Sequence, residues 1–416
     1  MKNRNFKYPL PSNQWIKKLI YWTDQNYANF AYLHGKDYGY PAGNFPHRLL
    51  GGNNLLEEEQ VWSGNSAGAK VGVISYDFKN RIEELNSTNS PVLALPDLCF
   101  FEAEFDLVFD TNGISSNIPL ESEFWQKIDQ IDLNEKSQKS LQIKNQLSQY
   151  EYFTAFEEIK NQIRKGNTYE LNFCQSFSAE FEHWNPILAY FELEKISPMS
   201  FSYLFKSGKK WIVSASPERY IKKVGARLIA QPIKGTVQRG ESKQNDLQNK
   251  KKLFESEKEQ AENLMITDLM RNDLAKIAET GSVKVDELFG VYALPKVFQM
   301  ISTVSAQSTD KASFKNIIEA TFPMGSMTGA PKIRTMEIID SLENFKRGWF
   351  AGAFGVVETD GDFDFSVIIR SIIADLEVKK LYFGVGSAVT IDANPDQEYQ
   401  ECLLKAGAII EVLCGK

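Results

Sequence analysis

The chain has 416 residues, of which 43% are hydrophobic and 24% are charged, and its formal net charge is −7. This is the composition of a globular protein with one large core or two smaller ones. It lacks the basic excess with which proteins bind nucleic-acid phosphates, so no nucleic-acid partner is expected. No apolar run is long enough to span a bilayer and residues 1–7 lack a signal-peptide core, so we expect a cytoplasmic protein with no membrane partner.

Residues up to 149 contain short apolar runs separated by turn residues, which indicates strands joined by irregular loops. Two of these runs, residues 71–76 and 91–96, are predicted strands. Residues 129–149 are polar and form the best linker candidate. We therefore predict a β-rich N-terminal region, 1–149, that packs on a second part, 150–416.

The second part opens with a predicted helix over residues 151–164. Phe153, Phe156, Ile159 and Ile163 recur at helical spacing, and Gly166 ends the pattern. Strands and helices then alternate irregularly to the C-terminus. The predicted class is α+β with a large antiparallel component.

A lysine follows the short predicted strand 227–230. In the segment 232–236, Lys234 stands in what we interpret as a glycine-hinged turn at a strand end, because Gly235 and Thr236 break the strand pattern. An amine there can meet a substrate and, if buried, can act as a nucleophile. The alternative is an ordinary surface lysine near a turn.

Carboxylates occur in two pairs with a spacing of three residues. Glu259 and Glu262 lie in one predicted helix, and Glu398 and Glu401 lie in another near the C-terminus. This spacing places each pair on one helix face, and oxygen ligands from two helices suit Mg²⁺. The alternative is two ordinary acidic helix faces. Because the three histidines, 34, 47 and 183, all precede the C-terminal half, proton transfer there must use carboxylates, lysines or water.

Two glycine-containing segments and one arginine complete the candidate site. The helix that follows residues 323–332 begins near Ser326 and Thr328, where a carboxylate can bind its free N–H groups. Residues 382–389 form a strand-like run that glycines interrupt, so a ligand can approach the backbone. Arg370, inside a predicted apolar strand, either forms a structural ion pair or binds a substrate carboxylate. An ordinary helix start and an ordinary turn are the alternatives for the two segments.

Taken together, these segments resemble the chorismate-utilising enzyme family. The resemblance runs almost continuously from residue 151 to the C-terminus and thins to residues 75–77 in the N-terminal part. The matching motifs are residues 216–219, 231–236, 261–266, 268–273, 281–285, 325–332 and 398–401. The resemblance implies a large α/β/β/α sandwich with two mainly antiparallel sheets, in which residues 150–416 are the chorismate-binding catalytic domain.

The P-I-K-G-T segment that contains Lys234 resembles the branch of the family that forms aminodeoxychorismate, because the anthranilate-forming branch has alanine at this position. The resemblance implies conversion of chorismate and ammonia to 4-amino-4-deoxychorismate, in 4-aminobenzoate and folate biosynthesis, through a covalent Lys234 adduct at ring carbon C2. The chain has no glutaminase signature. A separate glutamine amidotransferase subunit is therefore the expected source of ammonia.

The resemblance also implies a role for each candidate residue. Glu218 would be the general acid for the departing C4 hydroxyl, and Arg370 would hold the enolpyruvyl carboxylate. The implied Mg²⁺ ligands are Glu262 and Glu401 directly and Glu259 and Glu398 in outer or water-mediated positions. The metal would bind the ring carboxylate, assisted by Thr328, by the backbone at Gly384, Gly386 and Ser387, and by the charge of Lys405.

Three residues depart from the family pattern. Gln299 stands where a histidine is typical, Glu170 where amine-transferring relatives have glutamine, and Val356 where a tyrosine contacts substrate. Near the leaving hydroxyl the Gln299 amide would bind substrate by a hydrogen bond but cannot deliver a proton, so Glu218 would carry more of the acid work. No motif for an inhibitory amino acid is evident. Two alternatives stay open, namely anthranilate synthesis and a non-catalytic chorismate-binding protein.

Overall fold

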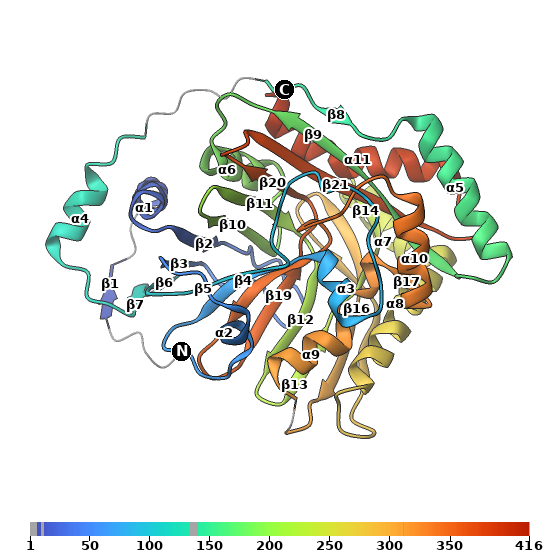
Figure 1. The fold of residues 1–416 in the computed structure, drawn as a ribbon, viewed down its shortest axis with the longest axis horizontal. Coiled ribbons are helices and arrows are strands. Elements are labelled where there is room, and N and C mark those ends of the chain that lie inside the picture. Colours follow the sequence, from blue (N-terminus) through green and yellow to red (C-terminus); the bar gives the residue numbers. More distant parts are fainter. Residues whose placement is uncertain (1–5, 10–11, 134–139, 311, 416) are drawn as a thin grey trace.

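The computed structural model describes residues 6–9, 12–133, 140–310 and 312–415. Its core is two large sheets whose paired strands are all antiparallel (Figure 1). The sheet of twelve strands contains β1 (Phe6–Tyr8), β2 (Asn29–Leu33), β3 (Arg48–Gly52), β6 (Phe105–Asp110), β7 (Gly113–Ser116), β8 (Lys144–Asn145), β9 (Glu170–Glu180), β10 (Phe201–Ser207), β11 (Lys210–Ser216), β17 (Gly329–Ala330), β20 (Ser371–Asp375) and β21 (Lys380–Val389).

The second sheet has nine strands, which come from both the N-terminal and the C-terminal parts of the chain. They are β4 (Lys70–Ile74), β5 (Leu98–Glu102), β12 (Arg219–Val224), β13 (Arg227–Ala230), β14 (Ile233–Gln238), β15 (Lys284–Ala293), β16 (Val297–Gln307), β18 (Ala353–Val357) and β19 (Phe363–Val367).

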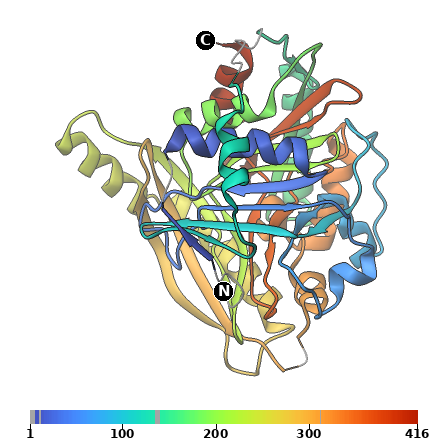
Figure 2. The same ribbon diagram turned by 90° about the vertical axis from the view of Figure 1, so that its left-hand side faces the viewer.

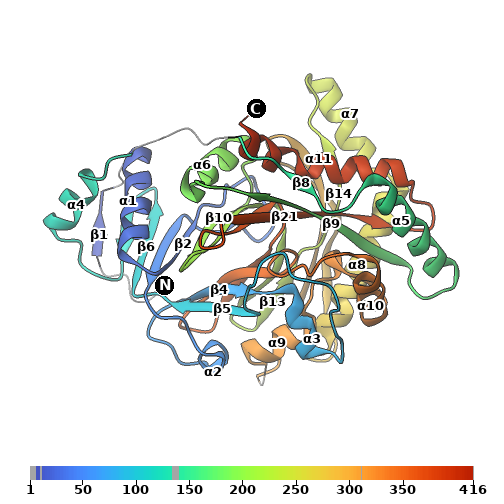
Figure 3. The ribbon, with the colours of Figure 1, turned by 45° about the horizontal axis from the view of Figure 1, so that its top comes forward.

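Helices cover the outer faces of the two sheets. They are α1 (Asn13–Asn26), α2 (Glu58–Trp62), α3 (Lys79–Ile82), α4 (Ser122–Asp129), α5 (Gln149–Arg164), α6 (Pro186–Ile196), α7 (Lys243–Phe254), α8 (Glu257–Ala275), α9 (Phe314–Thr321), α10 (Lys332–Leu342) and α11 (Pro395–Cys414). Figure 3 shows α6 and α11 on one side of the sheets, and α8 and α9 on the other. The predicted α+β class and the α/β/β/α sandwich are confirmed.

Apolar side chains fill the spaces on both faces of the sheets, so strands such as β2, β4, β18 and β20 are buried along their whole length. One large cluster includes Phe201, Tyr203 and Phe354 from the facing sheets. A second includes Phe177 and Phe383 under α5, α6 and α11. The rings of Tyr203 and Phe354 stack with centroids 3.8 Å apart, so aromatic packing joins the two sheets directly.

Strands of the N-terminal region belong to both sheets. In the larger sheet β2 pairs with β10, and in the smaller sheet β4 pairs with β18. Figure 2 shows α1 (blue) and α4 (teal), which pack on each other, beside the N-terminal strands. The predicted linker 129–149 contains β8, and its residues 134–139 lie outside the described part of the chain. The division at residue 149 stays a prediction.

Local structure confirms some of the predicted elements and corrects others. The predicted helix 151–164 is α5, which starts earlier because Ser148 caps it and Glu151 completes a capping box. Residues 91–96 do not form a strand, since a proline at each end removes a backbone donor. Residues 382–389 lie in the continuous strand β21, which pairs with β9 along its whole length, so their glycines do not interrupt it.

Candidate active site

The backbone around Lys234 is a strand with a bulge and not the predicted turn. Lys234 is the second residue of β14, and the pairing of β14 with β16 shifts register between Ile233 and Thr236. Gly235, inside this bulge, has φ +84°, a conformation that favours glycine. A β-bulge re-aims a side chain. The glycine therefore serves to direct the lysine, although it does not end the strand.

The ammonium group of Lys234 lies among carboxylates. It donates a hydrogen bond to Glu170, and the two side chains are 11% and 1% exposed. Burial by itself lowers the pKa of Lys234, but the charges of Glu170, Glu262 and Glu218 outweigh it and raise the pKa above its ordinary value. The resting lysine is thus a buried, protonated amine that needs a proton acceptor before it can act as a nucleophile.

Glu218 stands where the chain crosses from one sheet to the other. It lies between the end of β11 in the larger sheet and the start of β12 in the smaller one, and it is 5% exposed. Burial raises the pKa of Glu218 to about 7, against the lowering effects of the Ser326 hydroxyl and of Lys234. A carboxyl group with such a pKa is partly protonated near neutral pH, as a general acid must be.

Arg370 occupies a second crossing between the sheets, in the connection from β19 to β20, and not the interior of a strand as predicted. Its φ of +53° is rare for a residue other than glycine. The guanidinium donates to the backbone oxygen of Lys405 over 3.2 Å. Burial lowers the pKa of Arg370 to about 10, although Glu401 opposes this effect. No ion pair to Arg370 is found within the described residues, so its guanidinium N–H donors can bind a substrate carboxylate.

The two predicted carboxylate pairs lie on helices as expected, each within the first two turns, of α8 and of α11. Glu262 and Glu398 are buried, whereas Glu401 is half exposed. Burial raises the pKa of Glu262 to about 7, and it also raises the pKa of Glu259 and of Glu398. For Glu401 burial acts in the same direction, but the ammonium of Lys405, 2.7 Å away, lowers the pKa.

A divalent metal fits these residues in part. The described residues contain no group of three carboxylate, imidazole or thiol side chains arranged to hold a metal ion. Mg²⁺ is usually held by one or two carboxylates and completed by water and substrate oxygens, so such a cage is not required. Glu262 Oε1 is buried and has no hydrogen-bond partner in the described part of the chain. A buried carboxylate oxygen without a hydrogen-bond donor has a lone pair free to bind a cation.

The remaining predicted residues have mainly structural contacts. Thr328 is fully buried and donates to the carbonyl oxygens of Met324 and Gly325, 3.3 Å away in each case. Ser387 Oγ lies 3.0 Å from the Tyr152 hydroxyl. Lys405 donates to the backbone oxygen of Gly386 over 2.9 Å, which ties α11 to β21. Substrate contacts for these residues stay predictions.

The glycines of β21 have a packing reason that the sequence did not reveal. A Cβ at Gly384 would lie 2.4 Å from the Phe350 ring, and one at Gly386 would lie 2.5 Å from Cys174 Sγ. Both values are below van der Waals contact. The close approach that these glycines permit is therefore, in the first place, to the protein's own side chains.

The residues that depart from the family pattern are all buried. Gln299 is 4% exposed on β16, where it pairs with Thr236, and its Oε1 has no hydrogen-bond partner among the described residues. Val356 is 5% exposed on β18. Glu170 was noted in the sequence only as a departure. The structure makes it the direct partner of Lys234, a pairing that no short-range sequence pattern carries because 64 residues separate the two.

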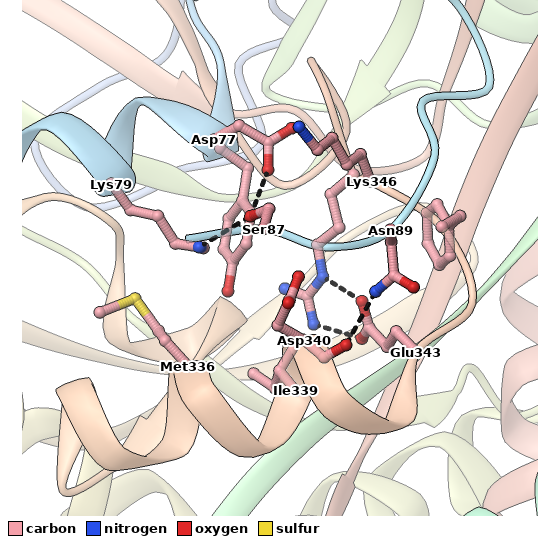
Figure 4. A pocket seen from close by; sticks show the side chains of 12 residues that line it. Asp77, Lys79, Ser87, Asn89, Met336, Ile339, Asp340, Glu343 and Lys346 are labelled. Carbon is pink, nitrogen blue, oxygen red and sulfur yellow. Dashed lines mark hydrogen bonds and ion pairs between the residues drawn. The ribbon is translucent and has the colours of Figure 1, made fainter. Parts of the chain in front are cut away.

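A small cavity, whose lining includes neither Lys234 nor Glu218, lies beside α10 (Figure 4). It holds about 10 Å³, enough for about one water molecule. Asp77, Lys79 and Glu343 are among its lining side chains. Arg347, which also lines the cavity, forms a buried ion pair with Glu343 and donates to the Met327 carbonyl oxygen. The polar groups around this cavity thus support the loop that carries Thr328.

Comparisons with known proteins identify the family of this chain. A model of the chorismate binding enzyme family matches residues 21–411. Aminodeoxychorismate synthase component 1 of Salmonella typhimurium is 33% identical, covering 83% of this chain and 77% of that protein. Anthranilate synthase component 1 1 of Haloarcula marismortui is 37% identical, covering 62% and 52%. Anthranilate synthase component I from Streptococcus pneumoniae superposes with a TM-score of 0.74 at 26% identity, covering 91% and 92%. The chain therefore belongs to the chorismate binding enzyme family.

Proposed function

We propose that this enzyme acts on chorismate and replaces its C4 hydroxyl group by an amine, giving 4-amino-4-deoxychorismate for 4-aminobenzoate and folate biosynthesis in the cytoplasm. The observation that carries the proposal is the buried amine of Lys234, directed by a bulge into a group of carboxylates that includes Glu218 and Glu170. The similarity to aminodeoxychorismate synthase component 1 supports the same reaction.

In the first step, the Nζ atom of Lys234 forms a bond to ring carbon C2 while both ring double bonds shift and the C4–O bond breaks. Glu218 gives its proton to the departing hydroxyl, which leaves as water. In the second step, ammonia forms a bond to C4, the double bonds shift back and the bond between C2 and Lys234 breaks. The new C4 ammonium returns one proton to Glu218, so the sum is chorismate plus ammonia to product plus water.

The ammonium of Lys234 must first lose a proton, and we assign Glu170 as the acceptor of this proton. The Glu170 carboxylate already accepts a hydrogen bond from the Lys234 ammonium. Proton transfer along this contact gives a neutral amine and a neutral carboxylic acid, both of which are favoured in a buried site. When the C2 adduct is released, the proton returns to Lys234.

Substrate orientation rests on two carboxylate anchors. Arg370 would bind the enolpyruvyl carboxylate with the guanidinium donors that its single backbone contact leaves available. Glu262 and Glu401, with Glu259 and Glu398 behind them, would hold Mg²⁺ near the ring carboxylate. Mg²⁺ supplies Lewis-acid charge that neutralises this carboxylate. Fixing both carboxylates holds the ring between the amine of Lys234 and the acid of Glu218.

Ammonia would come from a separate glutamine amidotransferase subunit. The name component 1, which the Salmonella relative carries, indicates an assembly of more than one component. The partner would therefore be a glutaminase that docks on this chain.

Anthranilate synthesis is the second candidate, and the 37% identity to an anthranilate synthase component favours it. Lys234 argues against it, because an amine placed at C2 blocks the position where anthranilate receives its nitrogen. A non-catalytic chorismate-binding role is the third candidate, prompted by Gln299, Glu170 and Val356.

A product assay separates these candidates. The purified chain is incubated with chorismate, Mg²⁺ and an ammonium salt, and the products are resolved by chromatography against 4-amino-4-deoxychorismate and anthranilate. We expect the 4-amino product from the wild type and none from Lys234→Ala, with chorismate binding retained in the variant. A 2-amino product supports anthranilate synthesis, no turnover supports the non-catalytic role, and full activity of Lys234→Ala refutes the covalent route.

A further inference from the structure

A lysine side chain lies between the two helices that carry the predicted metal ligands. Lys258, in the first turn of α8, places its Nζ atom 2.9 Å from Glu398 Oε1 on α11 and 3.8 Å from Glu262 Oε1 on its own helix. Its amine therefore bridges one carboxylate from each helix, across 140 residues of sequence. The oxygen of Glu262 that faces this amine is the one without a hydrogen-bond partner in the described chain.

Of the three side chains, only that of Lys258 is exposed enough to move into water. The side chains of Glu262 and Glu398 are 7% and 3% exposed, whereas that of Lys258 is 48% exposed. A lysine has a flexible four-carbon stem and a strongly hydrated ammonium, so it can withdraw into water at small cost. The buried carboxylates cannot, and they need a cation when they are ionised.

We propose that Lys258 is a built-in counter-ion that occupies the space between Glu262 and Glu398 until a divalent cation displaces it. Magnesium requires oxygen ligands at about 2.0–2.1 Å, which is much closer than a hydrogen-bonded ammonium sits. A divalent ion held directly by Glu262 would therefore lie beside the ammonium of Lys258, and the repulsion between the two cations would drive the lysine away from Glu262. This inference rests on the metal site of the proposed function, and it names the group that lowers the affinity of that site.

The arrangement has a consequence for the metal-free protein. The lysine limits the repulsion between two buried carboxylates, so it stabilises the fold before the metal arrives. The same interaction then has to be broken on metal binding. Lys258 thus raises the stability of the metal-free protein and lowers its affinity for the metal.

The test is magnesium binding to the full chain in the absence of chorismate, measured by titration calorimetry with magnesium chloride. We compare the wild type, Lys258→Met and the control Lys251→Met. Met keeps the stem of the side chain and removes its charge. Lys251, on α7, is 72% exposed and pairs with Glu255 over 3.7 Å, so its substitution controls for the loss of one surface charge.

We expect Lys258→Met to bind Mg²⁺ about fivefold more tightly or better. The variant has no ion pair to break when the metal binds, and no ammonium charge to repel it. Lys251→Met should match the wild type. Without metal, Lys258→Met should unfold at a lower temperature, and magnesium chloride should raise its unfolding temperature more than that of the wild type. Lys258→Gln provides a second neutral variant if Lys258→Met does not fold.

Equal or weaker magnesium binding by both neutral variants overturns the inference, and so does the absence of binding in every protein. The reaction itself is read separately, from the product formed with chorismate and ammonia. If the enzyme forms the 4-amino product but its magnesium affinity is the same with and without the charge of Lys258, this inference alone is refuted. A protein with the expected change in affinity but no amino product would refute the proposed function alone.

Discussion

The ion pair between Lys234 and Glu170 allows a stability test of the proposed nucleophile. The substitution Lys234→Met removes the ammonium and keeps the stem of the side chain. Glu170 is 1% exposed, and its Oε2 has no hydrogen-bond partner among the described residues. Removing one member of a buried pair in this way costs about 3–5 kcal/mol of unfolding free energy. Removing both charges, in Lys234→Met with Glu170→Gln, should recover most of that loss.

The cost should depend on pH, with a definite sign. Lys234 lowers the pKa of Glu218 and of Glu262, each of which is nevertheless raised to about 7 by burial. Without the lysine these pKa values rise further above their unfolded values. A carboxyl group with a raised folded pKa favours folding at low pH, and that contribution is lost as the pH rises through the folded pKa. The deficit of Lys234→Met should therefore be smaller at pH 6 than at pH 8.

The assay is urea unfolding followed by tryptophan fluorescence at both pH values. It uses the wild type, both single variants and the double variant, which together form a double-mutant cycle. We expect a coupling energy above about 1 kcal/mol at pH 8. Additive effects of the two substitutions, or a Lys234→Met deficit that is the same at both pH values, would refute the structural reasoning.

Two further predictions concern catalysis. Because Glu218 must be protonated to act as an acid and its pKa is about 7, kcat/KM for chorismate should fall as the pH rises above about 7, and Glu218→Gln should lose about 100-fold or more in kcat. A profile that stays flat to pH 9 would contradict this role. Glu262→Ala and Glu401→Ala should each lose the magnesium-dependent product formation, measured by titrating Mg²⁺ after chelation. An unchanged dependence in both variants would show that other residues hold the metal.

Periodic patterns along the chain were good guides to local structure. The helical spacing of Phe153, Phe156 and Ile159 correctly placed α5, and the spacing of three correctly placed each pair of glutamates on one helix face. These features depend on neighbours within one or two turns, so short stretches of sequence contain all the information they need.

Backbone geometry at Lys234 and Arg370 was predicted less well. Gly235 was expected to end a strand, but it lies in a bulge whose existence depends on β16, more than 60 residues away. Arg370 was expected inside a strand, but it lies where the chain leaves the smaller sheet for the larger one. A run of apolar residues does not reveal at which residue a chain changes sheets, because both strands are buried on either side of the crossing.

The sequence alone determined the family resemblance, the helical carboxylate pairs and the importance of Lys234, since each depends on residue identity and short-range spacing. Only the tertiary structure decided what surrounds the lysine. It brings Glu170 from β9 and Glu218 from a sheet crossing to the same amine. It also brings the side chain of Lys258 on α8 into contact with Glu398 on α11. The physical reason is that buried charges must be compensated in space, and antiparallel pairing brings together partners that lie far apart along the chain.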